Sequence, residues 1–138
     1  MAWVLMIVLY QKKMQNQKML KNALKSNAGF SILSGLALIV FNATFQSLFQ
    51  TQLQLWIVGL ILLLFAGQVL NLALKSTLPQ KEVKAIIVMD ILWVVGSAIL
   101  LLSVPQMPTA GRWIIALVAL FVADFAVFQY LGMRKALR

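Results

Sequence analysis

Two aspartates, Asp90 and Asp124, lie inside long apolar stretches of this 138-residue chain. On a lenient insertion scale, a charge facing lipid near the bilayer centre costs roughly 2.5–3.5 kcal/mol, so both carboxyl groups are expected to face protein or water. A carboxyl group in such a place can bind a proton or a cationic substrate, or work with a second carboxyl group as an acid–base pair. These two residues are therefore the first candidates for chemistry.

Most other catalytic chemistry is missing from the sequence. The chain has no cysteine and no histidine, which removes thiolate nucleophiles, disulfides, the usual general base and the commonest metal ligand. It also lacks a glycine-rich phosphate-binding loop. We predict that the protein uses no metal or cofactor and is not an enzyme, the one exception being an acid–base pair formed by Asp90 and Asp124.

The elements that must position these acids are membrane-spanning helices. Hydrophobic residues make up 62% of the chain, and the mean hydropathy of +0.93 is far above that of a soluble domain. Apolar runs near the length needed to cross a bilayer recur at residues 28–45, 53–74, 85–104 and 112–131. We predict an all-α integral membrane four-helix bundle that forms a single membrane domain over residues 1–138.

Residues 1–26 form a basic N-terminal segment before the first span. Its first ten residues are apolar but too short to span a membrane, and the part from Gln11 to Ser26 carries five lysines between apolar positions. This pattern predicts an additional amphipathic helix lying on an anionic membrane surface. Two alternatives are a lysine-rich tail that only fixes orientation, and a natural start at Met14 or Met19.

Lysine and arginine are distributed very unevenly between the loops. Five lie in the N-terminal segment, three between the second and third spans and three after the fourth, whereas Arg112 is alone on the other side. The positive-inside rule then places both termini in the cytoplasm, and the membrane is predicted to be a bacterial inner membrane. Because the cations serve as topology determinants, we predict no nucleic-acid partner.

Small and polar residues mark the helix faces expected to turn inward. One face of the first span carries Asn27, Ser31, Ser34, Gly35 and Asn42. Gly59 and Gly67 of the second span are expected to admit a close neighbour. The face of the first span is interpreted as a packing seam, with ligand contact as the alternative.

The two acids are predicted to reach the same layer of the membrane. Asp124 lies ten residues before Arg134 and Asp90 lies six residues after Lys84, about 15 Å and 9 Å along their helices. We predict a small polar pocket that opens to the cytoplasm and has Trp93 as one wall. Its candidate residues are Asp90, Asp124, Ser31, Ser34, Gln68 and Trp93. The alternative is a hydrogen-bonded cluster that only fixes helix register.

Two families of four-span proteins of this size are excluded by their required residues. Small multidrug exporters depend on a glutamate in the first span, where this chain has no acid. Fluoride channels carry a phenylalanine–serine–threonine–phenylalanine type motif and show weak charge bias, and this sequence has neither feature.

The sequence favours a small polytopic membrane protein that binds or assembles with another membrane component through its helical bundle. Its expected partners are the lipid bilayer and either a membrane protein or further copies of itself. The alternative is a small transporter or channel-like protein that uses Asp90 and Asp124 for a proton or a cationic substrate.

Overall fold

The computed structural model describes residues 1–136, which fold into five helices without a strand. They are α1 (Ala2–Val40), α2 (Asn42–Phe49), α3 (Leu55–Ala73), α4 (Gln80–Ser103) and α5 (Thr109–Ala136). Within this described part, four helices, α1, α3, α4 and α5, are long and apolar enough to cross a membrane. The predicted all-helical architecture with four candidate spans is therefore confirmed.

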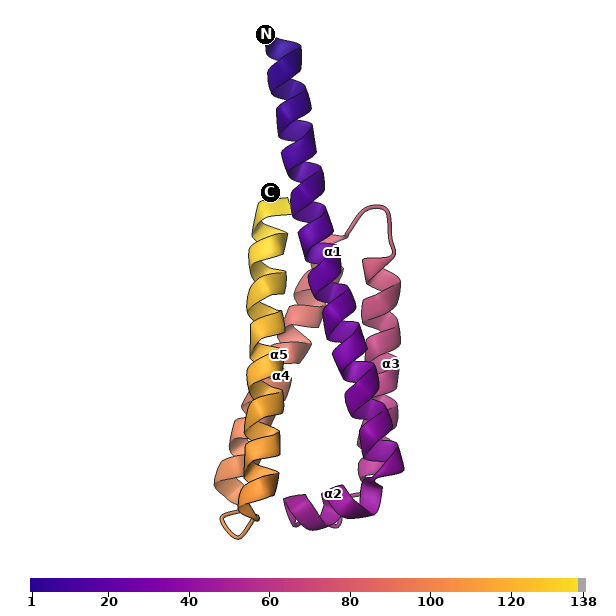
Figure 1. Ribbon diagram of the computed structural model, residues 1–138, viewed down its shortest axis with the longest axis vertical. Helices are drawn as coiled ribbons and strands as arrows, with labels where there is room; N and C mark the ends of the chain where they lie inside the picture. The colour runs from indigo at the N-terminus through magenta and orange to yellow at the C-terminus, as the bar shows by residue number, and fades with distance from the viewer. Residues whose placement is uncertain (137–138) are drawn as a thin grey trace.

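The four long helices pack as two pairs joined through α1 and α5. Helix α1 lies against α3 on one side and against α5 on the other, and α5 packs on α4, whereas α3 and α4 have few contacts with each other. The N-terminus and the C-terminal end of α5 lie at one end of the bundle, which we call the terminal end, and α2 runs across the opposite end (Figure 1). The order around the bundle is thus α3, α1, α5 and α4, and the α3–α4 side is the loosely closed one.

Helix α1 is a single uninterrupted helix of 39 residues, about 58 Å long. Its N-terminal part projects beyond the bundle at the terminal end (Figure 1), and residues 1–15 are all exposed. The separate interfacial helix predicted within residues 1–26 is not confirmed. Leu20 and Leu24 from that segment are fully buried, and no glycine or proline interrupts the chain between Gln11 and Ala28, so the helix continues directly into the first span.

Helices α1 and α3 approach each other at backbone contact distance. A Cβ atom on Gly35 would lie 2.8 Å from the carbonyl oxygen of Gly59, and one on Gly59 would lie 2.6 Å from the carbonyl oxygen of Gly35. The close neighbour predicted for Gly59 is confirmed. The one predicted for Gly67 is wrong, because a Cβ atom on this residue would meet no atom within 4 Å and the residue faces outward.

Helix α2 covers the predicted end of the first span, which was expected to reach residue 45, and the beginning of the connection to the second span. It ends at Phe49 and is capped by Gln50, whose φ of 51° and ψ of 49° are left-handed. The Asn42 side chain accepts a hydrogen bond from the backbone N–H of Trp56 at 3.1 Å, which satisfies a donor in the first turn of α3. At its far end, the carbonyl of Leu48 abuts Gly111 on α5. Helix α2 therefore links the start of α3 with the start of α5.

Arg112 completes the C-terminal end of α4. Its guanidinium group donates hydrogen bonds to the carbonyl oxygens of Val104 and Leu101, both at 3.1 Å. Carbonyl groups in the last turn of a helix have no partner within the helix and attract positive charge, so this contact stabilises the α4–α5 turn.

The apolar core lies toward the terminal end. Thirteen buried side chains form its main cluster, contributed by α1, α3, α4, α5 and the α3–α4 loop: Leu20, Leu24, Ala28, Val69, Leu72, Ala73, Leu78, Val83, Ile86, Ile87, Ala126, Met133 and Ala136. Beyond this core, α4 exposes much of its apolar surface, including Val95, Ile99 and Leu102. The helices are thus held firmly at one end and leave room between them further along.

Candidate binding site

Three polar side chains from three helices meet between the core and the middle of the bundle. They are Asn27 of α1, Asp90 of α4 and Gln129 of α5, and each is at most 3% exposed. The Asn27 Nδ2 group donates to Asp90 Oδ2 at 2.8 Å and to Gln129 Oε1 at 2.9 Å. The Gln129 Nε2 group donates to the same Asp90 oxygen at 2.7 Å. This triad, which we call the polar cluster, ties α1, α4 and α5 together.

The hydrogen-bond pattern of the polar cluster suits a carboxylate acceptor. Both amide groups present N–H donors to Asp90 Oδ2, and the Ser31 hydroxyl donates to Asn27 Oδ1 at 3.4 Å from one turn away. Rotating the Asn27 amide by 180° would place its oxygen against the Asp90 oxygen, so the network fixes that amide's orientation. Each of the three side chains makes at least two hydrogen bonds in this network, which makes the arrangement favourable in an apolar interior.

The second oxygen of Asp90 remains available. Among residues 1–136 no side-chain hydrogen bond reaches Oδ1. Every fully buried polar side-chain atom in this part of the chain has a hydrogen-bond partner, so Oδ1, which has none, is not fully buried. Oδ1 therefore keeps access to open space. Because Asp90 is one of the residues that line the adjacent cavity, we assign this opening to the cavity.

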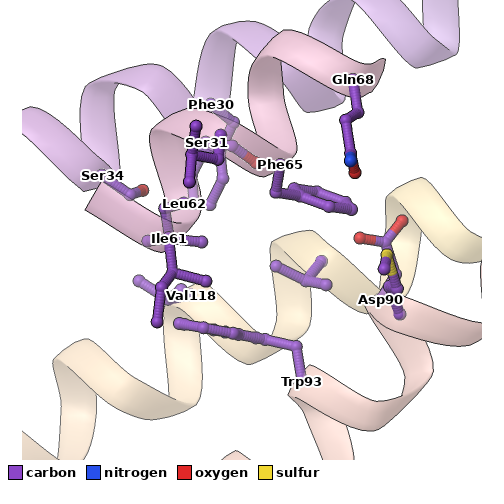
Figure 2. A pocket seen from close by; sticks show the side chains of 13 residues that line it. Phe30, Ser31, Ser34, Ile61, Leu62, Phe65, Gln68, Asp90, Trp93 and Val118 are labelled. Atoms are coloured by element: carbon purple, nitrogen blue, oxygen red, sulfur yellow. The ribbon is translucent and has the colours of Figure 1, made fainter. Parts of the chain in front are cut away.

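The cavity beside Asp90 has a volume of about 310 Å³ and is formed by all four long helices. Its walls are mostly apolar. Its lining residues are Phe30, Ser31 and Ser34 of α1, Ile61, Leu62, Leu64, Phe65 and Gln68 of α3, Met89, Asp90 and Trp93 of α4, and Val118 and Val122 of α5. Figure 2 shows the Trp93 ring extending along one side and the Gln68 amide directed toward the Asp90 carboxyl group.

Aromatic contacts hold α1 against α5 at the edge of this cavity. The Phe30 ring lies 5.5 Å from the ring of Phe121 and 5.6 Å from that of Phe125, centroid to centroid. Such tilted and edge-on pairs contribute about 0.5–1.5 kcal/mol beyond the area they bury. The wall carrying Ser31 and Ser34 is thereby fixed relative to α5.

Five of the six residues predicted for the pocket line this single cavity: Asp90, Ser31, Ser34, Gln68 and Trp93. The structure does not bring Asp124 to it. Asp124 is exposed on the outer side of α5, because Val122 and Ala126 turn the opposite face of the helix inward. Two residues after Val122, a side chain points roughly 200° around the helix axis.

Sequence reasoning missed two members of the polar cluster. The position of Asn27 predicted that its side chain faces inward from the first span, but it did not predict that the side chain reaches the pocket. Gln129 lies among polar residues near the C-terminus, so it was not set apart from its neighbours. A usable signal exists, since Asn27 precedes Ser31 by one turn and Gln129 follows Ala126 by three residues. Both spacings place an amide on the small-residue face of its helix.

No protein-family model, curated protein sequence or solved structure matches this chain, so its function is argued from its own geometry. Chemically, the site offers one carboxylate oxygen beside aromatic and aliphatic walls. Among the described residues that line the cavity, Asp90 is the sole acid and there is no basic side chain.

Proposed function

We propose that this protein binds, within its helical bundle, a largely apolar membrane component that carries one cationic or hydrogen-bond-donating group. One observation carries the proposal: the Asp90 carboxyl group stands at the wall of an apolar cavity, with Oδ2 held by two amides and Oδ1 free. Apolar cavities of roughly 300–1,000 Å³ with a few fixed polar groups are typical of small-molecule sites.

The chemistry of the cavity favours a cation over a neutral ligand. An ammonium group at Oδ1 makes a charge-assisted hydrogen bond, which contributes roughly 1.5–3 kcal/mol. The nearby Trp93 and Phe65 rings attract the same charge through their faces. The aliphatic walls accommodate the apolar remainder of the molecule.

The bilayer itself is the proposed source of the ligand. Helices α3 and α4 are the neighbouring pair with the fewest contacts, and both contribute residues to the cavity. A molecule dissolved in the membrane can therefore enter between them without crossing the tightly packed terminal end.

A non-catalytic role is part of the proposal. General acid–base chemistry with two carboxyl groups requires both to contact the same substrate. The exposed position of Asp124 on the outer side of α5 leaves Asp90 without that partner, which supports binding over catalysis.

Transport of a proton or small cation is the second candidate. It is favoured by the free oxygen of Asp90, an ionisable group at membrane depth of the kind found in transport pathways. Transport then depends on Asp90 alone. Flux in proteoliposomes that is abolished by Asp90→Asn supports transport, whereas saturable binding without flux supports the binding function.

We further propose that the terminal end faces the cytoplasm of a bacterial cell, across its inner membrane. The N-terminal part of α1, the end of α5, the α3–α4 loop and the first turns of α4 lie at this end (Figure 1), and these segments hold ten of the eleven basic residues within residues 1–136. The remaining one, Arg112, lies at the opposite end, where its charge caps α4. The positive-inside rule supports this orientation.

The binding proposal is tested by calorimetric titration of the protein in lipid nanodiscs with hexylammonium, and with hexanol as its uncharged counterpart. Empty nanodiscs correct for partitioning into lipid. We expect saturable hexylammonium binding that weakens at least tenfold in Asp90→Asn and stays unchanged in Asp124→Asn. Equal affinity of the wild-type protein for hexylammonium and hexanol would contradict the role given to Asp90.

A further inference from the structure

Asp124 occupies an unusual position for an acid in a chain of this kind. It is exposed on α5. Along the helix axis it lies about 15 Å from Arg134, which follows it by ten residues, and about 18 Å from Arg112, which precedes it by twelve. Within residues 1–136 the one ion pair joins Lys75 and Glu82, in another part of the molecule. Asp124 thus lies near the middle of its span, facing away from its own bundle.

Lipid is a poor environment for this side chain. Lysine and arginine can extend their long stems to the membrane surface, but the short side chain of aspartate cannot cover 15 Å. The inward-facing Asp90 receives two amide donors, whereas Asp124 is surrounded by exposed apolar side chains such as Leu120, Val127 and Phe128. A partner that supplies a donor at the same depth removes this cost.

The surroundings of Asp124 have the spacing of a helix-pairing seam. Six exposed residues follow one another at intervals of four, three, four, three and four: Trp113, Leu117, Leu120, Asp124, Val127 and Leu131. This is the heptad spacing by which two helices pack side by side, with Asp124 at a central position. A single polar residue in such a seam selects the partner and its register.

We propose that this seam of α5 docks a transmembrane helix of a different protein, one that carries a lysine or arginine at mid-membrane depth. Charge complementarity selects this occupant over a second copy of the chain. The apolar parts of the spans contain no basic residue, and a two-fold pairing through the seam brings two Asp124 side chains together. The docking surface lies on the outer side of α5 and is independent of the cavity at Asp90.

The test uses the full chain in lipid vesicles with fluorescent polyleucine transmembrane peptides that carry a central lysine or a central leucine. Association is measured by energy transfer to the labelled protein. We expect the lysine peptide to associate at least tenfold more tightly than the leucine peptide. In Asp124→Leu this preference disappears, whereas in Asp90→Asn, the matched acid on the inner side, it remains.

Asp124→Leu is expected to fold at least as stably as the wild-type protein, as judged by its melting temperature in the same lipid, and to retain hexylammonium binding. Loss of stability in this variant would overturn the proposal, because Asp124 would then serve its own bundle. Equal association of the two peptides also overturns it. Self-association that requires Asp124 overturns it in favour of a second copy as occupant.

Discussion

At the scale of single residues, the two intramembrane acids lie in different environments. Asp90 is 3% exposed and accepts hydrogen bonds from Asn27 and Gln129, whereas Asp124 faces outward. The sequence was sufficient to pick out both acids and five of the thirteen residues that line the cavity. It was insufficient to separate their roles, because rotation of a largely apolar helix about its axis depends on packing against its neighbours, and both faces of α5 contain apolar residues.

The polar cluster is predicted to stabilise the bundle through Gln129. Gln129→Leu keeps a similar volume but removes one of the two donors to Asp90 Oδ2 and one of the two acceptors for Asn27 Nδ2. Leaving buried polar groups unpaired costs about 1–3 kcal/mol, so the free energy of unfolding should fall by that amount. Reversible denaturation in mixed micelles measures it, with Asp124→Asn as a surface control. An unchanged stability in Gln129→Leu would show that the cluster contributes little.

Among the elements, α1 departs most from the sequence-based expectation. A change from basic amphipathic to apolar character near Ser26 predicted two helices, yet the structure has one. Composition reports which environment suits a segment, whereas a helix break requires local chemistry such as proline or a left-handed residue, and neither lies there. The burial of Leu24, and of Leu20 against Gly132 of α5, then extends the packed part of α1 beyond the apolar span.

The α1–α3 contact predicts a sharp difference between two glycines of α3. Gly59→Ala places a methyl group 2.6 Å from the carbonyl oxygen of Gly35, which forces the two helices apart. We expect its melting temperature to fall. Gly67→Ala meets open space and gains helix propensity of up to about 1 kcal/mol, so its melting temperature should hold or rise. Equal effects of the two substitutions would argue against backbone contact at Gly59.

The projecting part of α1 is predicted to be dispensable for folding. Residues 1–13 are exposed throughout, and the first fully buried side chain of α1 is Leu20. A chain that begins at Met14 should therefore keep the wild-type melting temperature and size-exclusion profile in detergent. Aggregation of this truncated chain, or a clear drop in its melting temperature, would show that the N-terminal residues support the bundle.

For the whole molecule, the sequence predicted the class of fold and the number of candidate spans, because helix length and hydropathy are properties of local composition. The sequence did not predict how the spans are arranged around the bundle. Which helices pair depends on side-chain shape across distant segments, such as Gly35 against Gly59 and Leu20 against Gly132. The cavity arises from that arrangement, since α3 and α4 have few contacts and their walls stay apart.

The proposed orientation predicts the labelling of single cysteines introduced at three turns. Gln50, Ser76 and Gln106 are exposed, and the native chain offers no competing thiol. An impermeant maleimide added to intact cells should label cysteines at positions 50 and 106 and spare the one at 76, which becomes reactive after lysis. Labelling restricted to position 76 in intact cells would invert the topology.

The most direct test of the central claim, that Asp90 presents a free carboxylate oxygen to a ligand in the cavity, is carbon-13 NMR. The chain has two aspartates, so labelling the aspartate side-chain carboxyl carbon gives two signals, which Asp124→Asn assigns. In nanodiscs, hexylammonium is predicted to shift the Asp90 signal saturably and to leave the Asp124 signal in place, while hexanol produces a much smaller shift. An Asp90 signal that stays unmoved under saturating hexylammonium would contradict the account.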